Sequence, residues 1–231
     1  MIETKGLTLH YGGARILHGI DFRAEKGEVT CLMGTNGVGK TSFLKALAGT
    51  HPRSGGEVTL DGETLGRLPA QEMASRGLAV VPQGRMIFPL LTVRENLETA
   101  YSLLPKAQHR IPDEIYELFP VLKDMTRRRG GDLSGGQQQQ LAIARAMIMR
   151  PKVLLLDEPT EGIQPNIIQQ IGRVIRYLKE RGDMAIILVE QYFDFAHDLA
   201  DRFYVLRSGA VALAGSRAEI SRERLRAEVS V

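Results

Sequence analysis

A glycine-rich segment, Gly34-Thr35-Asn36-Gly37-Val38-Gly39-Lys40-Thr41, has the residue types and spacing of a phosphate-binding loop. Its glycines allow the backbone to curl so that successive N–H groups face phosphate oxygens. Lys40 would place a cation on the β and γ phosphates of a nucleotide, and the Thr41 hydroxyl can ligate Mg²⁺. Residues 28–33 are typical of a buried strand entering the loop, and residues 40–48 of a helix leaving it. The N-terminus of that helix adds a positive dipole end, so the segment predicts a nucleotide site.

Two acidic residues follow a second buried strand. The apolar run at residues 153–156 fits a central parallel strand, and Asp157 and Glu158 come directly after it. Ligands of open α/β sheets lie at the carboxyl ends of strands, so both acids should lie beside the bound phosphates. We expect Asp157 to orient Mg²⁺ and Glu158 to polarise the attacking water as a general base.

A third segment, Leu133-Ser134-Gly135-Gly136-Gln137, opens a helix that runs to about residue 149. Its serine and glycines provide another helix N-terminus able to bind an anion. The segment precedes the acidic strand, which is the order found in ATP-binding cassette (ABC) proteins. With the phosphate-binding loop and the acid pair, the chain resembles an ABC ATPase along nearly its whole length.

Composition restricts the other function classes. The chain has 231 residues, of which 43% are hydrophobic and 25% charged, enough for one catalytic core. It contains no apolar run of about 18 residues, so we expect no direct insertion into a membrane. The net charge of +3 is too slight to indicate nucleic acid as a partner. Cys31 is the single cysteine and lies in a predicted core strand, which suggests neither a disulfide nor a cysteine metal site.

The remaining pattern alternates strands and helices. Thr92 with Glu95 predicts a capping box at the start of a mostly helical region. We further predict antiparallel strands in residues 2–25, strands near 56–62, 78–81 and 184–189, helices near 112–125, 135–149 and 167–178, a hairpin at 202–214, and a short exposed helix in the charged tail at 217–228.

The resemblance implies the fold class. It is α/β, an ABC-type P-loop nucleotide-binding domain with a mostly parallel core sheet, an antiparallel β lobe and an inserted helical lobe. Residues 1–231 would form this single domain, with the helical lobe at about 92–150.

The same resemblance implies roles for individual residues. Tyr11 occupies the position of the ring that stacks on adenine, although a half-buried strand tyrosine is the alternative interpretation. Gln83 matches the glutamine that senses Mg²⁺ and the attacking water. The implied catalytic residues are Glu158, Gln83 and Gln191, and the implied Mg²⁺ residues are Thr41, Gln83 and Asp157. The implied ATP-binding residues are Tyr11, Gly34, Asn36, Gly37, Gly39, Lys40, Thr41, Ser42, Ser134, Gly135, Gly136 and Gln137, of which the last four should contact ATP bound by a sister chain.

Two positions depart from the family pattern. Gln164 stands where an aspartate is usual, and Gln191 stands where the family has a histidine. Glutamine can hydrogen-bond a γ-phosphate but cannot carry a positive charge. Our hypothesis is that the site on this chain's phosphate-binding loop is the weaker half of an unequal pair.

Three classes of ABC protein compete for the function: transporter subunits, DNA-repair or chromosome ATPases, and translation factors. Repair and chromosome proteins carry long insertions for which residues 42–132 leave no room, and translation factors usually hold two cassettes in one chain. Transport is therefore the predicted function. Residues 82–89, 91–97 and 188–191 resemble importers of branched-chain amino acids and amides.

Finer segments resemble the ATP-binding proteins of urea ABC transporters, so urea is the expected solute and branched-chain amino acids or short-chain amides are the alternatives. These segments are residues 35–39, 117–122, 128–134, 137–143, 160–165 and 181–186. The cassette does not touch the solute, so this assignment depends on resemblance alone.

The resemblance also implies partners. They are a second ATP-binding subunit in a heterodimer, two membrane-spanning permease subunits and an extracytoplasmic solute-binding protein, although the sequence leaves a homodimer open. The chain would lie peripherally on the cytoplasmic face of the inner membrane.

Overall fold

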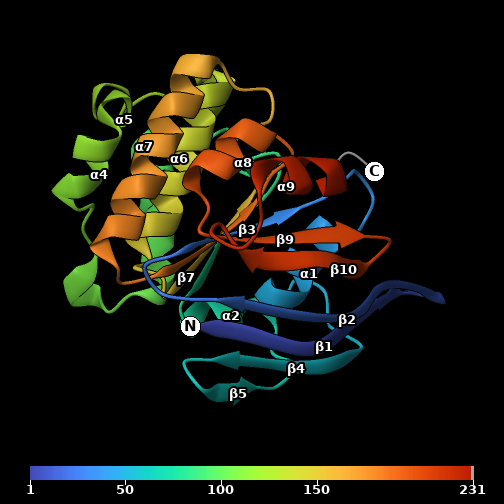
Figure 1. Cartoon of the computed structure of the whole chain (residues 1–231). Coiled ribbons are helices and arrows are strands. Elements are labelled where there is room, and N and C mark those ends of the chain that lie inside the picture. Colours follow the sequence, from blue (N-terminus) through green and yellow to red (C-terminus); the bar gives the residue numbers. More distant parts are fainter. Residues whose placement is uncertain (230–231) are drawn as a thin grey trace.

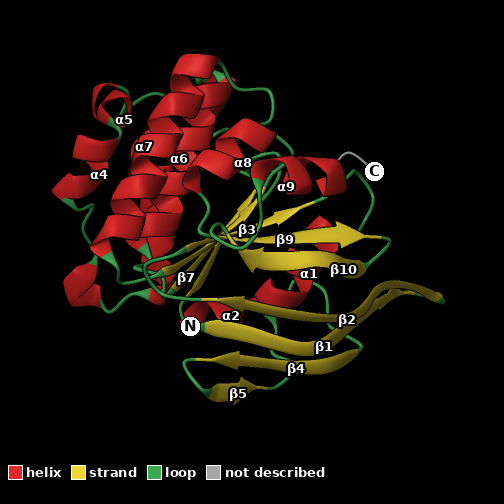
Figure 2. Cartoon of the chain, viewed as in Figure 1, coloured by secondary structure: helices red, strands yellow, loops and turns green. Residues whose placement is uncertain are grey.

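The computed structural model describes residues 1–229 (Figures 1 and 2). The strands are β1 (Ile2–Tyr11), β2 (Ala14–Ala24), β3 (Val29–Met33), β4 (Gly55–Leu60), β5 (Glu63–Leu65), β6 (Leu78–Val81), β7 (Val153–Asp157), β8 (Ala185–Val189), β9 (Arg202–Arg207) and β10 (Ala210–Ser216). The α-helices are α1 (Lys40–Ala48), α2 (Ala70–Ser75), α3 (Val93–Glu98), α4 (Asp113–Leu118), α5 (Pro120–Asp124), α6 (Gly135–Ile148), α7 (Pro165–Arg181), α8 (Phe193–Leu199) and α9 (Arg222–Val229).

A six-stranded sheet forms the centre of the molecule, in the order β10-β9-β3-β8-β7-β6. Every neighbouring pair from β9 to β6 is parallel, and only β10 is antiparallel to its neighbour. In the register of β7 with β8, Asp157 pairs with Val189. The residues that follow β7 and β8 therefore meet at one edge of the sheet, as the sequence predicts.

Both faces of this sheet are covered, which explains why β3, β7 and β8 are buried throughout. Alternate side chains point to opposite faces. On one face Leu154 and Leu156 pack in the same core as α6 and α7. On the other face Val153 and Leu155 share a core with α1 and the second sheet.

The second sheet is four-stranded and antiparallel, in the order β2-β1-β4-β5 (Figure 1). Its inward side chains, including Leu7 and Leu17, share the core of α1, which lies between the two sheets. This sheet places the end of β1 near the start of α1. The predicted α/β fold with an antiparallel β lobe is confirmed.

The helices between β6 and β7 lie together on one side of the molecule (Figure 1). The predicted capping box of Thr92 and Glu95 is present at the start of α3. The region from residue 92 to residue 150 is mostly helical, as predicted. Short 3₁₀ turns and loops separate α3, α4, α5 and α6. Pro105, Pro112 and Pro120 explain part of this, because proline is disfavoured inside a helix.

The C-terminal tail differs from the expected exposed helix over residues 217–228. Helix α9 starts only at Arg222, and Leu225 and Ile220 are buried in the core shared with α6 and α7. A highly charged helix can still bury one apolar position per two turns, which composition alone obscures. Of the helices in the described residues, none has the length and apolar character needed to span a membrane.

Candidate functional site

The glycine-rich loop joins β3 to α1, and its shape requires glycine at two positions. Gly34 has a φ of +141°, and a Cβ there would lie 2.4 Å from the Leu206 carbonyl oxygen. Gly39 has a φ of +107°, and its Cβ would lie 2.9 Å from Leu17. Side chains at these positions would deform the loop, so the pattern seen in the sequence is a steric requirement.

Lys40 is buried, with 5% of its surface exposed, and its ammonium lies beneath the loop. It donates hydrogen bonds to the carbonyl oxygens of Gly34 at 2.9 Å and Thr35 at 3.0 Å. Its Nζ is also 3.7 Å from Glu158 Oε1. Burial lowers the pKa of the Lys40 ammonium, while the charges of Glu158 and Asp157 oppose that shift. The loop thus holds a poorly hydrated cation where a phosphate can accept from it.

Asp157 ends β7 and faces α1. Its Oδ1 accepts a long hydrogen bond, 3.4 Å, from the Thr41 hydroxyl. Burial raises the pKa of the Asp157 carboxyl to about 6. A hydroxyl and one carboxylate are oxygen ligands of the kind that Mg²⁺ takes alongside phosphate oxygens and water. No cluster of three or more His, Cys, Asp or Glu side chains able to hold a metal occurs within residues 1–229. Thr41 and Asp157 therefore fit Mg²⁺ that arrives with a nucleotide better than a resident ion held by protein alone.

The raised pKa of Asp157 predicts that its charge destabilises the nucleotide-free fold. The ionised carboxylate costs about 3 kcal/mol at neutral pH, because each pKa unit corresponds to about 1.4 kcal/mol. The folded pKa lies above the unfolded value, so stability should rise as the pH falls from about 6 to about 4. We expect Asp157→Asn to raise Tm by roughly 6–12 °C at pH 7.5 and to flatten that pH dependence. Thermal unfolding of both chains from pH 4 to 8 without nucleotide measures this, and an unchanged pH dependence would contradict it.

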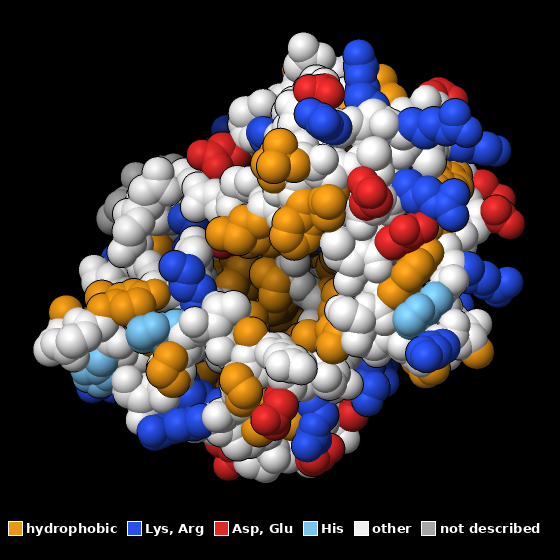
Figure 3. All heavy atoms as spheres, turned by 180° about the vertical axis from the view of Figure 1, so that it is seen from behind, with side chains coloured by type: hydrophobic (Ala, Val, Ile, Leu, Met, Phe, Trp, Pro, Cys, Tyr) orange, Lys and Arg blue, Asp and Glu red, His pale blue; other side chains and the backbone are white. Residues whose placement is uncertain are grey.

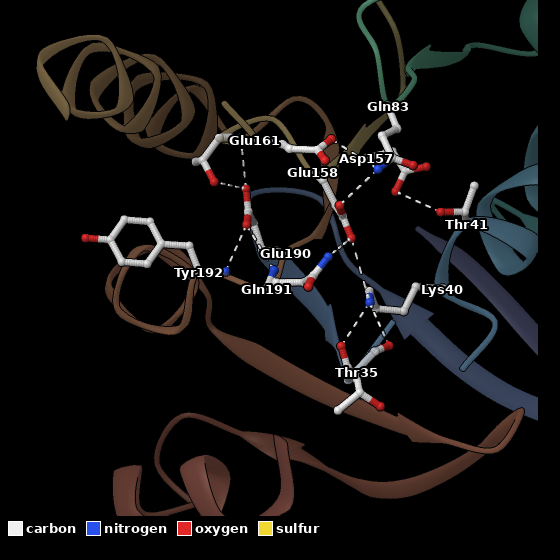
Figure 4. Close-up of polar contacts among 12 residues, drawn as sticks. Thr35, Lys40, Thr41, Gln83, Asp157, Glu158, Glu161, Glu190, Gln191 and Tyr192 are labelled. Atoms are coloured by element: carbon white, nitrogen blue, oxygen red, sulfur yellow. Dashed lines mark hydrogen bonds and ion pairs between the residues drawn. The ribbon is translucent and has the colours of Figure 1, made fainter. Parts of the chain in front are cut away.

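Glu158 is held by groups from three segments (Figure 4). Its backbone has a φ of +49°, an uncommon left-handed conformation, and its N–H donates to the Val189 carbonyl at 2.9 Å. Gln191 Nε2 donates to Glu158 Oε1 at 2.5 Å, and Gln83 Nε2 donates to Glu158 Oε2 at 3.2 Å. Backbone strain of this kind accumulates at functional sites. The carboxylate is an acceptor fixed in position, as a general base must be.

A cleft of about 400 Å³ collects most of the predicted site residues. It is lined by Tyr11, Ile16, Asn36, Gly37, Gly39, Lys40, Thr41, Ser42, Gln83, Glu158, Glu161 and Gln191. Gly34 and Asp157 lie outside this lining. Asp157 instead lines an adjoining cleft of about 480 Å³ together with Thr41 and Gln83. Apart from Gly34, the predicted loop, acid and glutamine residues thus line two clefts that share Thr41 and Gln83.

Tyr11 lies at the end of β1 and is 39% exposed. Its ring packs against His51, with a centroid distance of 4.4 Å and an interplanar angle of 47°. A lining position with an accessible ring suits an aromatic ligand, and the same exposure also fits the alternative of a half-buried strand tyrosine, so the adenine role stays a prediction.

The Ser134 segment is not part of either cleft. Ser134 caps α6: its N–H donates to Gln137 Oε1 at 2.9 Å, and its hydroxyl accepts from the Gln137 N–H at 3.4 Å. Gly135 lies against Arg85, and Gly136 lies against Ile167. The chain does not bring Ser134, Gly135, Gly136 and Gln137 to its own phosphate-binding loop. This agrees with the expectation that they serve a sister chain, which stays a prediction.

Three residues of the site were missed by the sequence reasoning. Ile16 and Glu161 line the cleft, and Gln83 Nε2 also donates to Glu161 at 3.1 Å. Glu190 is buried next to Gln191 and accepts hydrogen bonds from both sides of the site. The sequence does carry a signal for two of them. Glu161 lies in the turn after Glu158, and Glu190 directly follows a buried strand, which are positions where acidic side chains reach a site at the sheet edge.

Comparisons with known proteins give a consistent result. The family model described as ABC transporter matches residues 17–161. The chain is 41% identical to the high-affinity branched-chain amino acid transport ATP-binding protein BraG of Pseudomonas aeruginosa, over 92% of this chain and 91% of that protein. It is 36% identical to a probable branched-chain amino acid transport ATP-binding protein, LivF, of Archaeoglobus fulgidus, over 95% and 94%. Among solved structures it resembles a dimeric bacterial ABC transporter cassette with a TM-score of 0.83 and 26% identity, covering 94% of this chain and 99% of that one.

Proposed function

The chain belongs to the ABC transporter family and is an ATPase, and from this premise we propose that it powers the import of branched-chain amino acids. The observation that carries the catalytic part is the placement of Glu158 between Lys40, Gln83 and Gln191 at the phosphate-binding loop. The solute follows from similarity to BraG and LivF, which are branched-chain amino acid transport proteins by name. These relatives do not support urea, the solute that the finer sequence segments favour. They support the alternative solute, branched-chain amino acids.

ATP would lie in the cleft with its adenine on the exposed ring of Tyr11 and its phosphates on the loop of residues 34–41. Lys40 would exchange its carbonyl partners for phosphate oxygens. Thr41 and Asp157 would hold Mg²⁺, which when bound supplies charge neutralisation for the β and γ phosphates.

For hydrolysis, water attacks the γ-phosphorus as the bond to the β–γ bridging oxygen breaks, and the products are ADP and phosphate. Glu158 accepts the proton of this water. Gln83 and Gln191 hold the Glu158 carboxylate from opposite oxygens, so the base is oriented before the water arrives. Gln83 begins the loop that leads to α3, so its position can couple the nucleotide state to the helical region.

A second ATP-binding subunit would supply a Ser-Gly-Gly-Gln segment to this cleft, and Ser134–Gln137 of this chain would serve the partner's nucleotide. The separation of Ser134–Gln137 from the chain's own cleft and the similarity to a dimeric cassette support this arrangement. We propose a heterodimer because Gln191 and Gln164 depart from the family pattern on this chain. A partner subunit that carries the usual histidine and aspartate would then supply the stronger of the two sites.

We propose that the permease subunits dock beside Gln83. Met86, Phe88 and Leu90 follow Gln83 and are 68%, 48% and 78% exposed. The adjoining cleft of about 480 Å³ is lined mainly by apolar atoms, and hydrophobic side chains surround a hollow on the face shown in Figure 3. Exposed apolar side chains that gather on one segment mark interaction sites.

Residues 1–231 would act as one nucleotide-binding domain, with the helices of about 92–150 as the lobe that moves. This domain would be attached peripherally at the cytoplasmic face of the inner membrane. An extracytoplasmic binding protein would deliver the solute.

The exposed ring of Tyr11 predicts a selective effect on ATP binding. Stacking of a base on an aromatic ring contributes about 1–3 kcal/mol, so Tyr11→Ala should weaken ATP binding about 5- to 150-fold. Tyr11→Phe keeps the ring and should stay within about 3-fold. Equilibrium binding of a fluorescent ATP analogue measures both, and equal affinities for the Ala and Phe chains would contradict the stacking role.

Gln191 predicts a gain of function. A charged donor makes a hydrogen bond about twice as strong as a neutral one, and about 1.4 kcal/mol corresponds to a tenfold change in rate. Gln191→His should therefore raise hydrolysis at this chain's site about 10-fold. The assay uses an assembled transporter in which the partner's own catalytic glutamate is replaced by glutamine, so that only this site turns over. An unchanged rate would count against the unequal pair.

Uptake of labelled leucine and labelled urea at micromolar concentration tests the solute. The host lacks this chain and receives either the native chain or Glu158→Gln. We expect leucine uptake to return only with the native chain. Restored urea uptake without leucine uptake would move the protein to the urea branch and overturn the proposed solute.

A further inference from the structure

Glu190 is the most enclosed acidic side chain around the cleft, with 2% of its surface exposed. It follows β8 and directly precedes Gln191, and the proposed hydrolysis step gives it no role. No ion pair with Glu190 occurs among the described residues. A buried carboxylate without a cation needs several hydrogen-bond donors, so its partners reveal what it does.

Both carboxylate oxygens accept two hydrogen bonds, and the two pairs come from different segments (Figure 4). Oε1 accepts from the Thr160 N–H at 3.0 Å and the Thr160 hydroxyl at 2.7 Å. Oε2 accepts from the N–H groups of Gln191 at 3.0 Å and Tyr192 at 3.1 Å. Glu190 therefore connects the turn after Glu158 to the loop that carries Gln191.

The same two segments meet again at Glu158. The Gln191 amide donates to Glu158 Oε1, and the Glu158 N–H donates to the carbonyl of Val189. The direction of the Gln191 side chain depends on its backbone, whose N–H is held by Glu190. We propose that Glu190 is a positioning residue for ATP hydrolysis, which acts by fixing Gln191 and the Thr160 turn so that the Glu158 carboxylate keeps its orientation. This inference rests on the proposed function only in assigning Glu158 as the base.

The variant Glu190→Gln tests this bridge, by which we mean the connection that the Glu190 carboxylate makes between Thr160 and the Gln191–Tyr192 segment. Three of the four partners are backbone N–H groups, which can only donate, and they lie on both sides of the carboxylate. The Thr160 hydroxyl donates here but can also accept, so only an ionised carboxylate can satisfy the N–H groups of both sides at once. The amide nitrogen of Glu190→Gln would face either Thr160 or the Gln191–Tyr192 pair, leaving donors unsatisfied on that side. One segment is then released while the volume of the side chain is unchanged.

The first experiment measures amide hydrogen exchange by NMR in the full chain without nucleotide. In Glu190→Gln, exchange at Thr160, or at both Gln191 and Tyr192, should accelerate at least about 10-fold, and amides of β3 should not change. Glu180→Gln, an exposed glutamate on α7, is the matched control. Unchanged exchange at all three amides would overturn the bridge, whatever the chain is found to hydrolyse.

The second experiment separates positioning from folding, using the transporter in which only this site turns over. Glu190→Gln should lower kcat about 10- to 100-fold, with the KM for ATP within about 3-fold. In a Gln191→Ala background the same change should lower kcat less than about 3-fold, because the group through which Glu190 acts is already absent. An equal loss in both backgrounds, or a loss confined to KM, would overturn the proposal.

Thr160→Val provides a second variant if Glu190→Gln does not fold. It removes one of the four donors and leaves the three backbone N–H groups in place. Relative to the native chain, a loss of kcat of about 3- to 10-fold, as expected for one lost hydrogen bond, with KM unchanged, supports the bridge, and a native kcat overturns it. If the native transporter itself shows no ATP hydrolysis, the proposed function fails, and the exchange measurement still decides the bridge.

Discussion

Replacing the proposed base, in the variant Glu158→Gln, should abolish turnover at this chain's site while leaving ATP bound. General-base catalysis contributes about 10²- to 10⁴-fold, so we expect hydrolysis to fall about 100-fold or more. Glutamine has nearly the same shape, and Lys40 still faces the phosphates, so affinity for ATP should stay within about 3-fold. In the proposed dimer only the triphosphate would bridge the two subunits, so we expect the unhydrolysed complex to accumulate as a closed dimer.

The assay is phosphate release from the assembled transporter in which the partner's catalytic glutamate is replaced, with bound nucleotide measured in parallel. Glu72→Gln is the matched control, because Glu72 is exposed on α2 and does not line the cleft. Normal phosphate release by Glu158→Gln would show that another group is the base. Loss of both binding and turnover would instead assign Glu158 a structural role.

Lys40→Ala should have its largest effect on binding. A hydrogen bond to a charged group contributes about 1.5–3 kcal/mol, so ATP affinity should fall about 10- to 100-fold. AMP lacks the β and γ phosphates and should lose much less affinity than ATP. The variant also removes the cation 3.7 Å from Glu158, so residual turnover should not recover at saturating ATP.

Titration calorimetry of ATP, ADP and AMP with the nucleotide-binding chain measures this effect. Lys5→Ala, an exposed lysine on β1, is the control for loss of one positive charge. An equal loss of affinity for AMP and ATP would contradict a phosphate role for Lys40 and point to collapse of the loop.

The parts of the site that could be predicted from the sequence are those whose residue types are set by the local backbone or by the strand that precedes them. The loop of residues 34–41 needs glycine at Gly34 and Gly39 because the backbone there admits no Cβ, and that requirement is visible in the residue types. Asp157 ends, and Glu158 follows, a strand whose continuous apolar run indicates burial on both faces. Parallel strands then bring their carboxyl ends together, which places the acids beside the loop without further information.

The contacts that orient the base could not be predicted in this way. Glu190 looks like one more charged residue after a strand, and its role depends on Thr160 approaching it from a distant segment. The bond between Gln83 and Glu161 likewise joins segments separated by the whole helical region. The burial of Leu225 in the charged tail depends on where α9 packs, since one apolar residue among many charges carries no periodic signal.

The most direct measurement follows ATP hydrolysis and leucine accumulation together, in vesicles that contain the transporter whose partner glutamate is replaced by glutamine, so that only this chain's site turns over, with ATP on the side of this chain. With the native chain, we predict that accumulation requires ATP and rises in proportion to the phosphate released. With Glu158→Gln, we predict that both stop while ATP remains bound. Continued leucine accumulation by the Glu158→Gln transporter would contradict the claim that hydrolysis on this chain drives import.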